Sequence, residues 1–153
     1  MAETNTLRVL RRPEQLLSDD KRVIPRYLDF GNPARVRSIV ARVRRLSRRK
    51  AAALLAEVWE EFAARHRDLD GAFANSYEQV ARHCRGLDKL TETQRLLMGA
   101  YFTMEYSIES AALFNPSIVP HPDQTQLAPG AVRFLVSLRA TGEGHISSIV
   151  FRR

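Results

Sequence analysis

Two carboxylates in the sequence have a spacing that could serve metal chemistry. Glu105 and Glu109 lie four residues apart in a stretch whose apolar pattern predicts a helix, so both side chains would share one helix face. Carboxylate metal sites in helical bundles also use Glu-x-x-His pairs, which the sequence lacks. His66 and His83 lie in separate predicted helices without a neighbour at ligand spacing. We therefore expect no metal site and no resident cofactor.

Other catalytic signatures are also missing from the sequence. None of the P-loop, GxSxG, HExxH or GxGxxG motifs occurs. Cys84 is the single cysteine, which excludes an internal disulfide and predicts a semi-buried thiol in a reducing cytoplasm. There is no run of 18 apolar residues, and no apolar segment precedes the first charges, so we expect neither a membrane span nor export.

The positive charge is concentrated in one part of the chain. The net charge is +7, and eight basic residues with no acid lie between Asp29 and Glu57. Such a segment could contact phosphates, but no recognition helix, zinc spacing or aromatic RNA-binding signature accompanies it. We therefore expect no nucleic-acid partner and interpret the basic residues as a solvated or subunit-facing helix surface.

Apolar residues at helical spacing predict four helices, near residues 33–46, 48–67, 72–84 and 92–114. Asn32 before Pro33 and Ser47 are typical N-caps for the first two helices, and Thr91 with Gln94 forms a capping box for the fourth. Residues 96–114 are apolar on nearly every side. A helix of that kind must be surrounded, so we predict that the fourth helix is the central one.

Extended structure is predicted at both ends of the chain. Two short pieces, residues 7–10 and 22–28, indicate an N-terminal arm. Alternating apolar residues on both sides of a glycine-containing turn predict a β-hairpin near residues 132–151. A lone hairpin is only marginally stable in water. It should therefore dock on the helices or begin a larger β-structure.

Two runs, AALFNPSIVPHPDQ and RFLVSLRATGEGHISSIVFR, resemble the start of the catalytic domain in glycoside hydrolase family 130, the β-mannoside phosphorylases and β-mannosidases. The similarity is strongest over residues 101–152. It implies that residues 1–114 form an N-terminal arm and helical extension, and that residues 115–153 begin a five-bladed β-propeller without completing it. The expected fold class is mainly α, with about four helices followed by a β-hairpin that resembles the first propeller strands, a truncated α+β fold.

The same resemblance implies a carbohydrate site at Asn115, Ser117 and Arg139, which would hydrogen-bond the hydroxyls of the sugar whose bond is broken. An amide and a bidentate guanidinium suit vicinal hydroxyls, and a proline-fixed turn would hold the amide in place. Asn-Pro is also a common turn, and Arg139 could instead pair with a nearby acid. His121 and Asp123 lie in a loop where binding residues are plausible, but the sequence assigns them no role.

The family's general acid is an aspartate beyond the first blade, and its phosphate-binding residues follow later. The resemblance therefore predicts the N-terminal part of a protein acting on β-mannosides, with no catalytic residue of its own and no activity alone, and with inorganic phosphate as co-substrate if it is a phosphorylase. Whether the chain is an enzyme stays open. The alternative is a stand-alone helical interaction module whose basic, arginine-rich face contacts a protein or nucleic-acid partner. In either case an open hairpin edge predicts a homo-oligomer or an aggregation-prone monomer.

Overall fold

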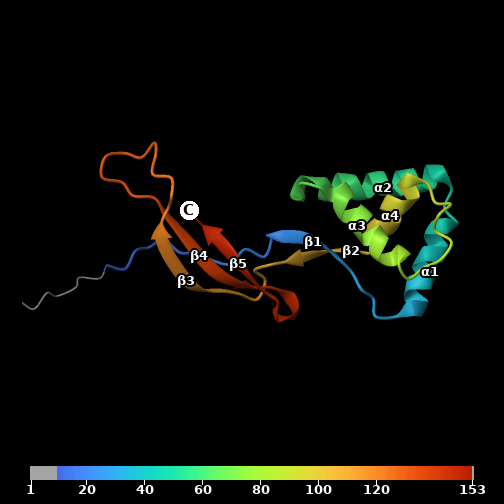
Figure 1. The fold of residues 1–153 in the computed structure, drawn as a ribbon, viewed down its shortest axis with the longest axis horizontal. Coiled ribbons are helices and arrows are strands. Elements are labelled where there is room, and N and C mark those ends of the chain that lie inside the picture. Colours follow the sequence, from blue (N-terminus) through green and yellow to red (C-terminus); the bar gives the residue numbers. More distant parts are fainter. Residues whose placement is uncertain (1–9, 153) are drawn as a thin grey trace, which may run out of the picture.

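A computed structural model describes residues 10–152 and shows helices at one end of the molecule and a sheet at the other (Figure 1). The helical end contains α1 (Pro33–Arg44), α2 (Arg48–Phe62), α3 (Leu69–Ala81) and α4 (Glu92–Tyr101), with a short 3-10 turn, Ala63–Arg65, after α2. A ribbon of β1 (Val23–Tyr27) and β2 (Thr103–Ser107) leads to β3 (Ala112–Pro120), β4 (Phe134–Thr141) and β5 (Ser147–Arg152). Of the predicted extended piece 7–10, only residue 10 lies within the described residues.

The helices α1, α2 and α4 begin where the local sequence signals place them, whereas α3 begins at Leu69, three residues before its predicted start. The Asn32 side chain accepts hydrogen bonds from the backbone N–H groups of Ala34 and Arg35, and Ser47 caps α2 in the same way through Lys50. Thr91 and Gln94 form the predicted capping box at the start of α4. These three signals act within one helical turn, so the sequence alone is sufficient to locate them.

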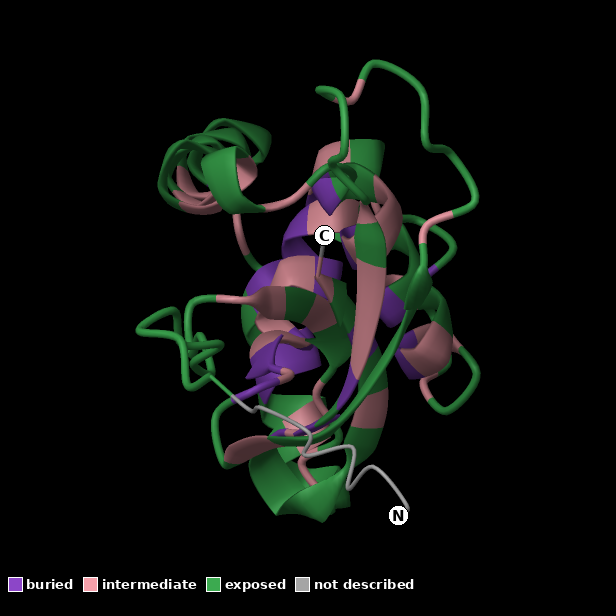
Figure 2. Ribbon diagram, turned by 90° about the vertical axis from the view of Figure 1, so that its left-hand side faces the viewer, coloured by how far each residue is buried: buried purple, intermediate pink, exposed green. Residues whose placement is uncertain are grey.

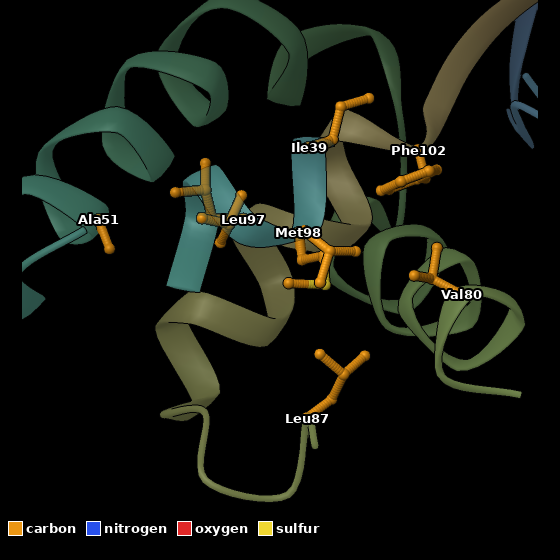
Figure 3. Close-up of a cluster of buried hydrophobic side chains, with 9 residues drawn as sticks. Ile39, Ala51, Val80, Leu87, Leu97, Met98 and Phe102 are labelled. Atoms are coloured by element: carbon orange, nitrogen blue, oxygen red, sulfur yellow. The ribbon is translucent and has the colours of Figure 1, made fainter. Parts of the chain in front are cut away.

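The helical end has its own hydrophobic core (Figure 3). Met98 and Phe102 are fully buried at its centre. Close contact between α3 and α4 requires Gly99, because a Cβ at that position would overlap the Phe73 carbonyl group. In Figure 2 the purple buried segments lie in the inner part of the molecule, whereas the outer loops are mostly green and exposed. The core consists of Ile39, Val40, Val43, Ala51, Val80, Leu87, Leu97, Met98 and Phe102.

The prediction of a long central helix over residues 92–114 is wrong. The last helix ends at Tyr101, and β2 begins two residues later and pairs antiparallel with β1, with Tyr27 opposite Thr103 and Val23 opposite Ser107. The Thr103 hydroxyl hydrogen-bonds the Gly99 carbonyl oxygen at 2.9 Å, which helps to end the helix. The apolar stretch that was predicted as one helix therefore contains the end of a helix followed by a strand, and these two elements bury different faces.

The predicted fold class is also wrong in its β part. The expected hairpin is β4 and β5 of a three-stranded antiparallel sheet, in which residues 112–120 supply the additional strand β3. Within residues 10–152 neither sheet closes on itself, and the arrangement is four α-helices with two small antiparallel sheets rather than the first strands of a propeller. The β3 strand escaped prediction because Asn115–Pro116 reads locally as a turn, whereas long-range pairing with β4 accommodates it as a bulge.

The sheet has a second, smaller core and a direct connection to the ribbon. Leu138, Ala140 and Val150 are buried on one sheet face, against Ile108. The Tyr106 hydroxyl on β2 donates to the Glu143 carbonyl oxygen at 3.1 Å, in the turn that joins β4 and β5. Within residues 10–152 no helix combines the length and apolar character that crossing a membrane requires.

Candidate functional site

The most unusual backbone feature of the sheet is a bulge in β3. Phe114 lies opposite Arg139 and Ser117 opposite Ser137, so Asn115 and Pro116 together oppose a single residue of β4. Asn115 has a φ of 52°. This left-handed conformation is tolerated better by asparagine than by most residues with a side chain. Bulges of this kind locally redirect a strand, and they occur often beside binding sites.

Arg139 lies directly beside this bulge and is held in place by neutral groups. Its Nε and terminal nitrogen donate to the Ser147 hydroxyl oxygen at 3.1 and 2.9 Å, and its guanidinium carbon lies 5.5 Å from the centre of the Phe114 ring. Among the described residues no carboxylate forms an ion pair with it. The alternative that Arg139 pairs with a nearby acid is therefore not observed, and its remaining N–H groups face an exposed surface.

The sheet brings two of the three predicted site residues onto one face. Ser117 is opposite Ser137, and Arg139 is two residues from Ser137, so Ser117 and Arg139 point to the same side. Asn115 is exposed in the bulge between Phe114 and Ser117. This face is open: Phe151, opposite Ser137, is 56% exposed, and Ile149, opposite Arg139, is 63% exposed. The surface thus combines hydrogen-bonding groups with apolar side chains.

His121 and Asp123 lie in the loop between β3 and β4 and form hydrogen bonds within it. The His121 ring nitrogen Nδ1 accepts from the Asp123 N–H at 3.0 Å, and Arg133 contacts the Asp123 carboxylate at 3.4 Å. Hydrogen bonds from the Thr125 hydroxyl and N–H lower the pKa of Asp123, with the Arg133 charge adding to the effect. Both residues therefore have structural partners inside the loop.

Glu105 and Glu109 do not share a helix face, because β2 and the turn after it replace the predicted helix. Glu105 binds Arg65 through two hydrogen bonds, at 2.9 and 3.2 Å, and accepts from His66 at 2.8 Å. The Arg65 hydrogen bonds are the main cause of the lowered pKa of Glu105. Among the described residues no group of three or more His, Cys, Asp or Glu side chains could hold a metal ion.

Glu109 is fully buried and ionically paired. Its carboxylate binds Arg152 at 2.8 and 2.9 Å, contacts Arg22 and accepts from the Asp19 N–H at 3.0 Å. Burial raises the pKa of Glu109, but hydrogen bonds from Arg152 and Asp19 and the charges of both arginines outweigh burial and leave the pKa lowered. A general acid needs a raised pKa, so neither Glu105 nor Glu109 is suited to that role at neutral pH.

A second candidate site is a cavity of about 820 Å³ between α1 and the end of α3. Segment 27–32 borders it, as do His83 and Cys84, which the sequence alone left without a role. No sequence signal marked this cavity, because its walls come from segments about 50 residues apart.

No family model matches the chain, and neither a curated protein nor a solved structure does. The resemblance of residues 101–152 to the β-mannoside-active enzymes, and the role of Asn115, Ser117 and Arg139, therefore stay predictions.

Proposed function

We propose that this chain contributes a carbohydrate-contacting surface to a glycosidase or glycoside phosphorylase that acts on β-mannosides. The observation that supports this best is the register of β3 and β4, which places Ser117 and Arg139 on one open sheet face, with Asn115 exposed in the adjoining bulge. The three residues come from two strands and are those that the sequence resemblance implies for a sugar site. A cytoplasmic protein fits the single cysteine.

The chemistry of the surface suits a sugar ring. A guanidinium group offers several N–H donors in one plane, and an amide offers both donors and an acceptor, so together they can bind adjacent hydroxyls. Phe114 and Phe151 lie on the same side as Arg139 and provide apolar area against which the C–H face of a pyranose can pack. Ser147 fixes Arg139 and thereby reduces the entropy that binding would otherwise cost.

This surface would supply binding rather than proton transfer. Glu105 and Glu109 are ionised partners of arginines, and Asp123 is a hydrogen-bond acceptor inside its own loop. We therefore expect no mannoside hydrolysis or phosphorolysis by the 153-residue chain, with or without inorganic phosphate. Binding should be weak, of about millimolar affinity, because one open face buries little of a ligand.

The test is a titration of the isotopically labelled chain with methyl β-mannoside, followed by amide NMR shifts. We expect concentration-dependent shifts around residues 114–117 and 137–139, and smaller shifts with methyl β-glucoside, which differs only at the C2 hydroxyl. Arg139→Ala should abolish the shifts. Asn115→Gly should weaken them while keeping the left-handed backbone that the bulge needs.

Arg45→Ala is the matched control, because it removes the same charge at the end of α1, far along the chain from the sheet. It should leave the titration unchanged. Shifts that spread evenly over the protein, or equal titrations for Arg139→Ala and the unaltered chain, would contradict the proposal. Turnover of a mannoside by the chain alone would contradict the expected absence of a catalytic acid.

A further inference from the structure

The cavity at the helical end of the molecule has an apolar floor and a basic rim. Val36 and Val40 of α1 and Val80 of α3 form part of its lining. Around them lie Arg37, Arg44 and Arg85. Its volume of about 820 Å³ falls in the range of cavities that hold small organic ligands. The site is therefore large enough for a ligand with both an apolar and a charged part.

The arginines that line the cavity differ from the other arginines of α1 in the contacts that their guanidinium groups make. The guanidinium carbons of Arg35 and Arg42 lie 4.6 and 5.0 Å from the ring centres of Phe30 and Tyr101. In contrast, among the described residues Arg37, Arg44 and Arg85 form no ion pair with a carboxylate. Within residues 10–152, no contacting carboxylate therefore neutralises these three cations.

The only described carboxylate in the lining is that of Asp29, and it is already engaged. It accepts a hydrogen bond from the Gly31 N–H at 2.9 Å, in the turn before α1. With three arginines and one aspartate the ionised lining carries a net charge of about +2. Like charges gathered at a concave surface raise the local concentration of anions and strengthen their binding.

The Arg44 side chain reaches the turn that contains Arg85, another residue of the cavity lining. The terminal nitrogens of Arg44 lie 3.9 Å from the position that a Cβ on Gly86 would occupy, so the Arg44 side chain crosses from α1 to the turn after α3. Arg85 is the residue before Gly86 and also lines the cavity. A planar guanidinium group matches the oxygens of a phosphate group, which accept bidentate hydrogen bonds, and both arginines line this cavity.

We propose that this cavity binds a small organic phosphate, with the phosphate group between Arg44 and Arg85 and an aromatic or similarly apolar body against Val36, Val40 and Val80. Tyr27 borders the same space. Burial, the Asp29 carboxylate and Cys84 raise the pKa of Tyr27, which keeps its phenol protonated as a hydrogen-bond donor. This site is separate from the sheet face of the proposed carbohydrate surface and does not depend on it.

The test uses phenyl phosphate as the probe, with inorganic phosphate and phenol as its two halves. Isothermal titration should give a dissociation constant for phenyl phosphate at least about tenfold lower than for either half, because only the whole probe uses both the arginines and the apolar floor. Cys84 is the only cysteine and lines the cavity, so its alkylation by iodoacetamide reports occupancy. Phenyl phosphate should slow this reaction, and phenol should not.

Arg44→Ala and Arg45→Ala form a matched pair of adjacent substitutions with the same charge change. Arg44 lines the cavity and Arg45 does not. Arg44→Ala should weaken phenyl phosphate binding about tenfold, the usual size of a lost charged hydrogen bond, and Arg45→Ala less than about twofold. Ala41→Leu should also weaken binding, because Ala41 lines the cavity and a larger side chain there would occupy cavity volume without changing the charge. Circular dichroism should show that all three variants are folded.

Three results would overturn the proposal. One is the absence of detectable phenyl phosphate binding to the unaltered chain. Another is an equal loss of affinity in the Arg44→Ala and Arg45→Ala variants, which would indicate a diffuse basic surface. The third is a single-stranded oligonucleotide that binds far more tightly than phenyl phosphate, loses affinity equally in both variants and leaves Cys84 alkylation unchanged.

Discussion

At the scale of single residues, Glu109 joins three segments that are distant in the sequence. Asp19 and Arg22 precede β1, Glu109 follows β2, and Arg152 ends β5. The Glu109 side chain is fully buried, whereas those of Arg22 and Arg152 are 38% and 24% exposed. Removing a carboxylate from water is costly, and the hydrogen bonds from both arginines and the Asp19 N–H offset this cost. Glu109 therefore fixes the segment before β1 against the sheet.

Glu109→Gln should destabilise the protein by about 2–4 kcal/mol, because it removes the charge that compensates two arginines and keeps the side-chain volume. Urea unfolding followed by circular dichroism measures the change. Glu143→Gln, at an exposed turn position, is the control and should change the free energy of unfolding by less than about 0.5 kcal/mol. Equal stabilities of the Glu109→Gln variant and the unaltered chain would contradict this role.

The same carboxylate should make stability depend on pH in acid. The folded-state pKa of Glu109 is lowered, so its contribution is complete above the unfolded-state pKa of about 4.3 and is lost as the pH falls through the folded-state value. Between about pH 5 and pH 3 the unaltered chain should therefore lose more stability than Glu109→Gln does. Parallel pH curves for the two proteins would show that Glu109 does not titrate in this way.

The sequence predicted contacts between residues that are close along the chain, but not contacts between residues that are far apart. Asn32, Ser47 and Thr91 were identified as caps because each acts on a backbone group two or three residues away. The partners of Glu109 are 43 and 87 residues away and follow no periodic pattern. The roles of Asn115, Ser117 and Arg139 rest on resemblance alone, and the sequence contained no signal for the bulge at Asn115 or for the register that brings Ser117 and Arg139 to one face.

At the scale of elements, the transition from α4 to β2 shows where apolar periodicity fails. Residues 96–114 are apolar on nearly every side, a pattern that a buried helix and a helix followed by a strand satisfy equally. The structure has the second arrangement because Thr103 hydrogen-bonds the Gly99 carbonyl, and because β1 supplies a partner for β2. That partner, Val23–Tyr27, precedes the helices and contains Pro25, which is tolerated because β1 is an edge strand.

Gly99→Ala tests how closely α3 and α4 pack. Helix propensity alone predicts that this change stabilises α4 by about 1 kcal/mol. The structure predicts the opposite sign, a loss of about 1–3 kcal/mol, because the new methyl group would overlap the Phe73 carbonyl and force the helices apart. Thermal unfolding distinguishes the two outcomes. Ser38→Ala, at an exposed position of α1, is the control for propensity and should be neutral or slightly stabilising. A higher melting temperature for Gly99→Ala would contradict the close approach.

At the scale of the whole molecule, the two ends differ in how completely they are packed. The helical core buries nine hydrophobic residues, whereas the sheet core buries three. Figure 1 shows that the ribbon β1–β2 lies between these two ends. The face of the sheet opposite its core carries Arg139 together with exposed Phe151 and Ile149. The part of the molecule with the least internal packing is thus the part to which we assign carbohydrate contact.

The same sheet should also make the chain self-associate, as the sequence predicts. Among the described residues the outer edges of β3 and β5 pair with no other strand, and Ile149 and Phe151 of β5 are 63% and 56% exposed. An exposed apolar edge strand is a template for pairing with another copy.

We expect a molar mass above that of the monomer in size-exclusion chromatography with light scattering, rising with protein concentration. Ile149→Lys should shift the distribution towards monomer, because a lysine on an edge strand opposes pairing and this position lies outside the sheet core. Ala53→Lys adds the same charge at an exposed position of α2 and should leave the mass unchanged. A monomeric mass at every concentration, or equal dissociation by both variants, would show that the sheet edge does not mediate association.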